Sequence, residues 1–146
     1  MEIVKRNCCV AMPLDPDNRL LLQKKNADYV YWPNYWCTFG GGMKDSEDPK
    51  TTLLREMREE NGLEFFDVEL FESQIFYDES QIGPKKRREG LVHYFSARFD
   101  GDLKKIKFGE GSGFSIFDKP ELYKYNKLGL IVPYNYEVIE RFMNSL

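Results

Sequence analysis

The sequence predicts a single α/β domain, built as a sandwich around a mixed β-sheet, and three observations support this fold class. The chain has 146 residues, which suits one domain with one sizeable core. Apolar residues make up 42% of the chain and charged residues 31%, as in an ordinary globular protein. Strand-like and helix-like segments follow one another in the order strands, helix, strands, helix, which is the order of an α/β sandwich.

Two strands joined by a turn open the chain. Residues 3–14 are apolar with few interruptions and predict a strand. Pro16, Asp17 and Asn18 predict a turn, because each of these residue types favours a tight backbone reversal. A second apolar run begins at residues 20–22, so we expect the two strands to pair as a hairpin.

An aromatic loop and a short strand come next. Residues 26–36 are rich in tyrosine and tryptophan and predict the loop, and residues 36–39 predict the strand. Residues 40–42 are three consecutive glycines, which we expect to form a loop. Glycine lets the backbone turn tightly and approach a ligand closely, so this loop is a candidate binding element.

The first helix is predicted between Asp48 and Gly62. Asp48 followed by Pro49 is a favourable start, because the carboxylate can cap the helix and proline suits its first position. Gly62 is a favourable end, because glycine readily adopts the left-handed conformation found there. Leu53 and Met57 lie on one apolar side, which we expect to face a core.

Two long strands, a short strand and a closing helix complete the predicted order. Residues 68–77 and 91–99 predict the long strands, which a polar and basic segment connects. Residues 114–117 predict the short strand. Residues 133–146 predict an amphipathic helix with one apolar side.

Three carboxylates are predicted to share one face of the first helix, because Glu56, Glu59 and Glu60 are spaced at i, i+3 and i+4. Like charges at this spacing cost an isolated helix about a few tenths of a kcal/mol, so stability does not account for them. Clustered carboxylate oxygens are typical ligands of a hard divalent cation such as Mg²⁺ or Mn²⁺. The alternative is a solvated face in which Arg55 pairs with Glu59. The glycine run and Glu47 at the helix entrance favour the metal site.

The segment around this helix follows a specific pattern. Residues 41–63 read GGMKDSEDPKTTLLREMREENGL, which fits Gly-x5-Glu-x7-Arg-Glu-apolar-x-Glu-Glu-x-Gly-apolar. This segment resembles the Nudix box, the signature of hydrolases that cut diphosphate bonds linked to another group. At residue frequencies of about 7%, seven fixed identities match by chance with odds on the order of 10⁻⁸ per start position. The resemblance implies the Nudix fold, an α/β/α sandwich with a mixed β-sheet, over residues 1–146.

The resemblance also implies a role for each polar residue of the box. The helical metal ligands would be the three glutamates described above, together with a backbone carbonyl near Gly41. Glu47 and Arg55 would form an ion pair that orients the helical carboxylates. Glu56 would be either the base that positions the attacking water or a pure metal ligand.

Residues outside the box resemble those of the enzymes that remove 8-oxo-dGTP. Glu110, between two glycines, is similar to their auxiliary glutamate and would be a further catalytic and metal-binding residue; the alternative is an exposed loop carboxylate. Asn135, in a Pro-x-Asn sequence before the last helix, would recognise a purine through its amide, or else cap that helix. Tyr35 and Trp36 would offer faces for base stacking, or else pack against the core.

Other charged and polar residues predict structural roles. The net charge of −3 gives no reason to expect general nucleic-acid binding. The basic run at residues 85–88 predicts a solvated hairpin tip, with contact to substrate phosphates as the alternative. His93 lies in a predicted strand, which indicates a structural role.

The cellular location is predicted from cysteine usage and apolar runs. Cys8, Cys9 and Cys37 lack a metal-binding spacing, and an odd count without a secretory signal suggests free thiols in a reducing compartment. No apolar run approaches the roughly 20 residues that a membrane-spanning helix needs. We therefore expect a cytoplasmic protein that does not bind membranes.

Together these observations predict a hydrolase of the Nudix kind. The expected reaction is hydrolysis, with Mg²⁺ or Mn²⁺, of a nucleoside diphosphate linked to another group. Nucleoside triphosphates, oxidised ones included, are the leading substrates, and nucleotide sugars or ADP-ribose are the alternative. A non-catalytic nucleotide sensor with the Nudix fold, or an interaction protein that binds no metal, is the alternative function. The expected partner is a small nucleotide rather than a nucleic acid, and the protein could form a homodimer.

Overall fold

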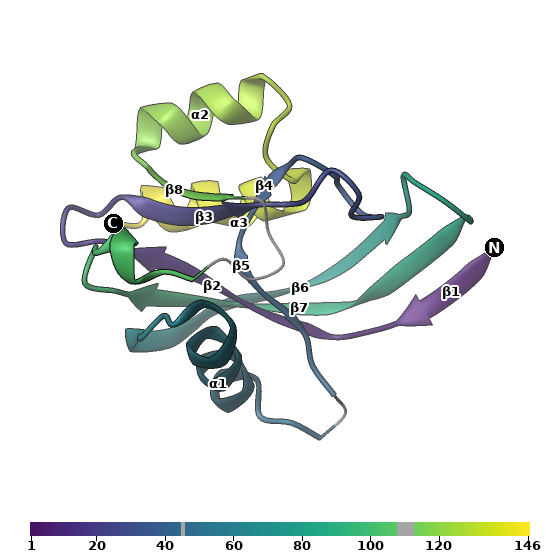
Figure 1. Cartoon of the computed structure of the whole chain (residues 1–146), viewed down its shortest axis with the longest axis horizontal. Helices are drawn as coiled ribbons and strands as arrows, with labels where there is room; N and C mark the ends of the chain where they lie inside the picture. Colours follow the sequence, from purple (N-terminus) through teal and green to yellow (C-terminus); the bar gives the residue numbers. More distant parts are fainter. Residues whose placement is uncertain (45, 108–112) are drawn as a thin grey trace.

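The computed structural model describes residues 1–44, 46–107 and 113–146, and Figure 1 shows their arrangement. In chain order, the elements are β1 (Glu2–Lys5), β2 (Cys8–Leu14), β3 (Leu20–Lys24), β4 (Trp36–Cys37), β5 (Phe39–Gly42), α1 (Pro49–Asn61), β6 (Phe66–Glu79), β7 (Lys86–Arg98), the 3-10 helix η1 (Leu103–Lys105), β8 (Gly113–Phe117), α2 (Lys119–Lys127) and α3 (Pro133–Asn144). The predicted order of strands, helix, strands and closing helix is confirmed.

The described strands form one mixed sheet of eight strands, in whose interior β7 and β2 lie side by side. β1 and β2 pair with one edge of β7 in parallel, and β6 pairs with the other edge in antiparallel fashion. β2 pairs further with β3 and β5, and β3 pairs with β4 and β8, all antiparallel. The prediction of a mixed sheet is therefore confirmed.

β1 and β2 lie end to end along β7. Glu2 pairs with Lys86 and Leu14 pairs with Arg98, so the register does not slip between the two strands. The single strand predicted over residues 3–14 is wrong in this respect, because the chain leaves the strand conformation for two residues between β1 and β2.

The break between β1 and β2 is held by close backbone contacts. The side-chain Oδ1 atom of Asn7 accepts a hydrogen bond from Leu91 N at 3.0 Å. The backbone carbonyl of Asn7 accepts one from Met43 N at 2.9 Å. A Cβ atom on Gly90 would lie 2.1 Å from the Arg6 carbonyl oxygen. Glycine is therefore required for β7 to approach the chain at this break.

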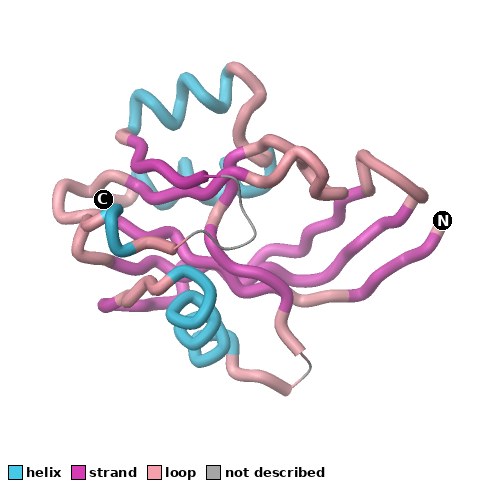
Figure 2. The backbone as a smooth tube through the Cα atoms, viewed as in Figure 1, coloured by secondary structure: helices cyan, strands magenta, loops and turns pink. Residues whose placement is uncertain are grey.

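The sheet separates two apolar cores, and helices cover both of its faces (Figures 1 and 2). Successive residues of β2 face opposite cores: Cys9 and Ala11 face the core under α1, and Val10 and Met12 face the core under α2 and α3. Every residue of β2 is buried as a result, which explains its nearly continuous apolar sequence. The predicted α/β/α sandwich is confirmed.

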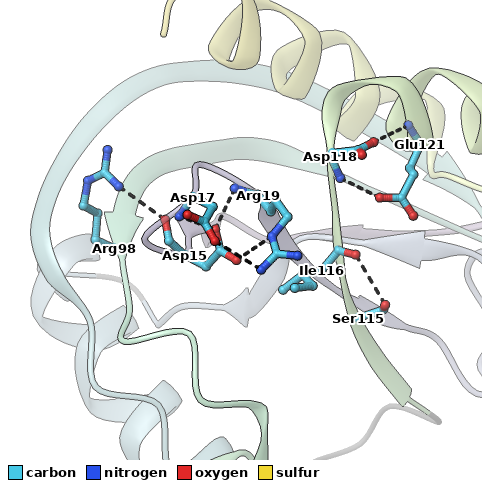
Figure 3. A network of polar contacts seen from close by, with 8 residues as sticks. All are labelled: Asp15, Asp17, Arg19, Arg98, Ser115, Ile116, Asp118 and Glu121. Atoms are coloured by element: carbon cyan, nitrogen blue, oxygen red, sulfur yellow. Dashed lines mark hydrogen bonds and ion pairs between the residues drawn. The ribbon is translucent and has the colours of Figure 1, made fainter.

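The turn between β2 and β3 is organised by the buried carboxylate of Asp15 (Figure 3). Its Oδ1 atom accepts hydrogen bonds from Asp17 N at 2.9 Å and Arg19 N at 2.8 Å, and its Oδ2 atom accepts one from Arg19 Nε at 2.9 Å. Leu14 then pairs with Leu20 across the turn. The predicted turn and hairpin are confirmed.

The three glycines at residues 40–42 lie in a strand, so the prediction of a glycine loop is wrong. They pair with β2 as part of β5. Gly40 has φ +139°, and a Cβ atom there would lie 2.1 Å from the Cys9 carbonyl oxygen. Glycine is needed here because β5 approaches the backbone of β2 closely, not because the chain turns.

Helix α2 is absent from the predicted elements. Only Leu122 of this helix is buried, so the segment lacks the apolar periodicity that predicts a helix. Its start is nevertheless encoded in a capping box (Figure 3). Asp118 accepts a hydrogen bond from Glu121 N at 2.9 Å, and Glu121 accepts one from Asp118 N at 3.0 Å.

The closing helix α3 is confirmed and packs by its apolar side, which includes Val138, Ile139 and Phe142. An ion pair between helix and sheet adds to this packing. Arg141 donates to both carboxylate oxygens of Glu72 in β6, at 2.7 and 2.8 Å. Among the described residues, no helix combines the length and the apolar character needed to span a bilayer.

Candidate functional site

Helix α1 begins and ends at the predicted residues, so its side chains have fixed directions. The Oδ2 atom of Asp48 accepts hydrogen bonds from Thr51 N at 2.9 Å and from Thr51 Oγ1 at 2.7 Å. Gly62 has φ +68°, and its N–H donates to the Arg58 carbonyl at 3.1 Å. Both the cap and the left-handed end are confirmed.

The apolar side of α1 packs on the sheet and leaves its carboxylates outside the core. Leu53 and Met57 are buried against the strands. Glu56 is half-buried, whereas Glu59 and Glu60 are exposed. The face shared by the three carboxylates therefore lies beside the buried side, at the boundary between sheet and solvent.

Glu47 links the loop before α1 to the helix. Its Oε1 atom accepts a hydrogen bond from Lys44 N at 2.6 Å, and its Oε2 atom accepts one from Thr52 Oγ1 at 2.9 Å. Arg55 Nη2 lies 3.4 Å from the same Oε2 atom, so the predicted ion pair is present. The N–H of Lys44, with the Thr52 hydroxyl and Arg55, lowers the pKa of Glu47. Glu47 is therefore held as a carboxylate.

Glu56 has the opposite electrostatic environment. Partial burial, followed by the negative charge of Glu60, raises the pKa of its carboxyl group. Beneath it, burial raises the pKa of the Cys9 thiol to about 12, and the charge of Glu56 adds to this. This environment favours the neutral thiol form of Cys9.

A cavity of about 340 Å³ begins at the C-terminal end of α1. Glu60, Asn61 and Gly41 lie in its wall, whereas Glu56 and Glu59 do not. The rest of the lining comes from strands β1 to β7, α3 and the segments between them. It includes the cationic residues Arg6, Lys25 and Arg88 and the aromatic residues Tyr29, Tyr31, Trp32 and Tyr134. An acidic helix end thus meets a cavity whose other ionic groups are largely cationic.

The basic run at residues 85–88 is not a solvated tip throughout, and the prediction is wrong for Arg88. Lys85 and Lys86 are exposed, but Arg88 lies in β7 and lines the cavity. It pairs with the buried carboxylate of Asp78 in β6. Burial disfavours the charged form of Arg88, but the Asp78 carboxylate outweighs this and raises the pKa of the guanidinium. The spacing of the sequence could have indicated this. Residues four apart lie on the same face of a strand, so Arg88 shares a face with Val92, which is buried.

Asn135 lies in the cavity wall, but it is not the cap of α3. The N-cap is Val132, which places Asn135 inside the helix, so the capping alternative is wrong. The Asn135 side chain joins three elements instead. Its Oδ1 atom accepts a hydrogen bond from Thr38 N at 3.2 Å, and its Nδ2 atom donates to Tyr94 Oη at 3.0 Å.

Tyr35 and Trp36 do not line this cavity. Trp36 packs edge-to-face on Phe117, with ring centroids 5.1 Å apart, and Tyr35 packs in the same manner on Trp32. Contact of either ring with a base stays a prediction. His93 lies in β7 as predicted, and its Nδ1 atom lies 2.8 Å from Ser73 Oγ.

The acidic face of α1 suits a divalent cation by its chemistry. In the described part of the chain, no three His, Cys, Asp or Glu side chains are arranged to hold a metal ion. The donors are nevertheless carboxylate oxygens, which Mg²⁺ and Mn²⁺ prefer. The charge of Glu60 raises the pKa of Glu56, and a cation here would relieve this repulsion. Glu110, the further predicted ligand, lies outside the described residues.

Comparisons with known proteins agree with this arrangement. The NUDIX domain family matches residues 5–142. A curated relative, an RNA pyrophosphohydrolase of Agrobacterium fabrum (strain C58 / ATCC 33970), is 28% identical over 131 residues, which are 82% of this chain and 76% of the relative.

Two solved structures show the same fold. The MutT protein from Methanosarcina mazei Go1 has a TM-score of 0.71 and 17% identity, over 99% of this chain and 97% of that chain. The dihydroneopterin triphosphate pyrophosphohydrolase of E. coli has a TM-score of 0.69 and 16% identity, over 98% of this chain and 99% of that chain.

Proposed function

This chain belongs to the Nudix hydrolase family, and from that premise we propose that it hydrolyses the diphosphate linkage of a nucleoside triphosphate with Mg²⁺ or Mn²⁺. One observation carries the proposal: an acidic helix face lies at the end of a cavity large enough for part of a nucleotide. Arg6 and Lys25 in the cavity wall suit an anionic ligand, and the aromatic rings in the same wall suit a base.

The residues of α1 have distinct roles in this proposal. Glu56, Glu59 and Glu60, with the backbone carbonyl of Gly41, would hold the cation. Once bound, the cation would offset phosphate charge and lower the pKa of a bound water. Glu56 would position the attacking water, and its half-buried place one helical turn before Glu60 of the cavity wall supports this role. The ion pair between Glu47 and Arg55 would orient the helical carboxylates.

The printed names of two similar proteins support cleavage of a diphosphate linkage, and triphosphates as the substrates are our proposal. The Agrobacterium relative and the E. coli enzyme are both named pyrophosphohydrolases. Asn135 would contact a purine through the second hydrogen of its Nδ2 atom, because the first is donated to Tyr94. Glu110 would be an auxiliary ligand. The membership of a hydrolase family and the intact glutamates of α1 favour catalysis over a sensor that binds without turnover.

The proposal includes two further predictions, a cytoplasmic location and assembly into a homodimer. Cys8, Cys9 and Cys37 are buried free thiols, which suits a reducing compartment such as the cytoplasm. A homodimer is tested by light scattering of the purified protein.

Metal dependence tests the proposed function. Removal of divalent cations with EDTA should abolish release of pyrophosphate or phosphate from nucleoside triphosphates, and Mg²⁺ or Mn²⁺ should restore it. Glu59→Gln and Glu60→Gln should each lower kcat by roughly tenfold or more, because each removes a charged ligand and keeps its shape.

Glu64→Gln is the matched control for these variants. Glu64 is exposed, lies just beyond α1 and pairs with Arg58 at 3.0 Å. Its loss should leave kcat within about twofold, because exposed ion pairs contribute little. Full activity in a metal-free preparation, or normal rates in both α1 variants, would rule out the proposed chemistry.

A further inference from the structure

A largely buried ion pair lies at the cavity wall, and neither of its residues has a role in the proposed catalysis. Asp78 in β6 and Arg88 in β7 are direct cross-strand partners. Arg88 Nε lies 2.8 Å from Asp78 Oδ1, and Arg88 Nη2 lies 3.0 Å from Asp78 Oδ2. The side chain of Asp78 is 1% exposed and that of Arg88 is 17% exposed. The two parallel hydrogen bonds fix the plane of the guanidinium.

Asp78 is also held by two aromatic residues. Tyr134 Oη donates to its Oδ2 atom at 2.8 Å, and Trp32 Nε1 donates to the same atom at 3.3 Å. These contacts join the aromatic loop, β6, β7 and α3 around one carboxylate. A buried ion pair adds little stability compared with apolar residues of similar size, so stability is a weak explanation for this arrangement.

Arg88 keeps donors for a ligand after it has bound Asp78. A guanidinium carries five N–H groups, and two of them are used by Asp78. These two bonds use Nε and Nη2, so Asp78 engages neither N–H group of Nη1. Arg88 lines the cavity, and the Tyr31 ring lies 4.2 Å from its Cζ atom. One face of the guanidinium is therefore covered, its orientation is fixed, and its remaining edge can donate to a ligand.

The strand register places Arg88 further along the sheet than the glycines of β5. Gly42 in the cavity wall pairs with Cys8, which pairs with Val92 of β7. Arg88 lies four residues before Val92 on the same strand and face, which is about 13 Å at the rise of a β-strand. A ligand whose phosphates lie near α1 and the glycines would place its base, rather than its phosphates, near Arg88.

We propose that Arg88 is a specificity-determining residue that binds the O6 and N7 acceptors of a 6-oxopurine, so that the site selects guanine or hypoxanthine nucleotides over adenine nucleotides. Arginine presents two donors in one plane, which suits these two adjacent acceptors. Adenine carries an N6 amino group, which is a donor, in place of the O6 acceptor. One N–H donor of Arg88 would then face the N6 donor and form no hydrogen bond. Asp78 acts as a positioning residue that holds the guanidinium. This inference rests on the proposed function only in that the cavity binds a nucleotide.

Binding measured without turnover tests the inference. Calorimetry with non-hydrolysable guanosine and adenosine triphosphate analogues in Mg²⁺ should show about tenfold or more tighter binding of the guanosine analogue to the natural protein. Arg88→Lys keeps the charge opposite Asp78 but loses the planar pair of donors, so the preference should fall close to one. Arg141→Lys is the matched control, since Arg141 makes the same paired contact with Glu72 outside the cavity.

A second experiment changes the ligand and keeps the natural protein, so its result does not depend on whether a variant folds. The 7-deaza guanosine analogue lacks the N7 acceptor and keeps O6. It should bind the natural protein about fivefold or more weakly than the guanosine analogue, because one of the two acceptors is gone. Equal affinity for the 7-deaza compound and its parent overturns the inference, whether or not Arg88→Lys folds.

The remaining outcomes separate this inference from the proposed function. An equal loss of affinity for both nucleotide analogues in Arg88→Lys would show that Arg88 binds phosphate, and an unchanged preference would show that it does not contact the base; both overturn the inference. Turnover of GTP and ATP at equal kcat/KM supports the hydrolase and overturns base selection. Guanosine-selective binding that depends on Arg88, without turnover, supports the inference and removes the proposed catalysis.

Discussion

At the scale of single residues, Asn135 shows how one side chain can fix the cavity wall. It is 5% exposed, and its two side-chain polar atoms contact Thr38, just before β5, and Tyr94 in β7. Burial, partly offset by this contact with Asn135, raises the pKa of Tyr94, so its hydroxyl stays protonated. The amide therefore ties α3 to the sheet from inside the molecule.

We expect Asn135→Ala to lower the free energy of unfolding by about 1–3 kcal/mol, because Thr38 N and Tyr94 Oη lose a buried partner. Urea denaturation measures this loss. Asn144→Ala, at the exposed end of the same helix, is the control and should change stability by less than about 0.5 kcal/mol.

The same variant tests recognition of a purine by Asn135. If the amide contacts the base, the ratio of kcat/KM for purine to pyrimidine triphosphates should fall by about five- to more than a hundredfold, as expected for a lost hydrogen bond. A lower midpoint with an unchanged ratio would limit Asn135 to its structural contacts.

At the scale of elements, α1 brings its own start and the site together. Asp48 caps the first turn, and Thr52 in that turn donates to Glu47. The cap therefore supports the residues that hold Glu47 next to Arg55. Damage to the first turn should affect both the stability of the helix and the orientation of the carboxylates beyond it.

We expect Asp48→Ala to destabilise the protein by about 0.5–2 kcal/mol, because Thr51 N and its hydroxyl lose their acceptor. Asp48→Asn keeps an oxygen at the cap and should cost much less. Thermal unfolding of the two variants at one pH makes the comparison. Equal midpoints for Asp48→Ala and the natural protein would show that the cap contributes nothing to this helix.

At the scale of the whole molecule, ion pairs join elements that are distant in the sequence. Glu72 of β6 binds Arg141 of α3, and Glu89 of β7 binds Lys5 of β1. In each case a hydrogen bond from the basic partner lowers the pKa of the carboxyl group. The unfolded chain therefore binds protons more readily than the folded protein at acidic pH.

We expect stability to fall in acid and not near neutrality. The folded pKa values of Glu72 and Glu89 lie below the unfolded value of about 4.3 for glutamate. The stability that their ion pairs contribute is therefore complete above that pH, and it is lost as the pH falls through the folded pKa values. Thermal midpoints measured between pH 7 and 3 should therefore decline mainly below about pH 4.5. Glu72→Gln lacks one such carboxylate and should show a shallower decline; an identical decline would mean that Glu72 takes no part.

Local signals explain what could be predicted from the sequence. Asp48, Pro49 and Gly62 set the bounds of α1, and Glu56, Glu59 and Glu60 share a face because helix geometry depends only on spacing along the chain. The same holds for the apolar side of α3 and for the turn at Asp15. The family pattern over residues 41–63 lies within this local segment, so the acidic part of the site could be predicted without the fold.

Tertiary structure alone decided the rest of the site. Gly40 belongs to a strand because the backbone of β2 lies against it. Asn135 lies inside α3 rather than at its cap, where its side chain accepts a hydrogen bond from Thr38 N and donates one to Tyr94 Oη in the core. Arg88 is half-buried rather than fully solvated because Asp78 lies opposite it across the β6–β7 pair. Each outcome depends on partners that are distant in the sequence, since burial and pairing are decided by packing between elements and not by neighbours along the chain.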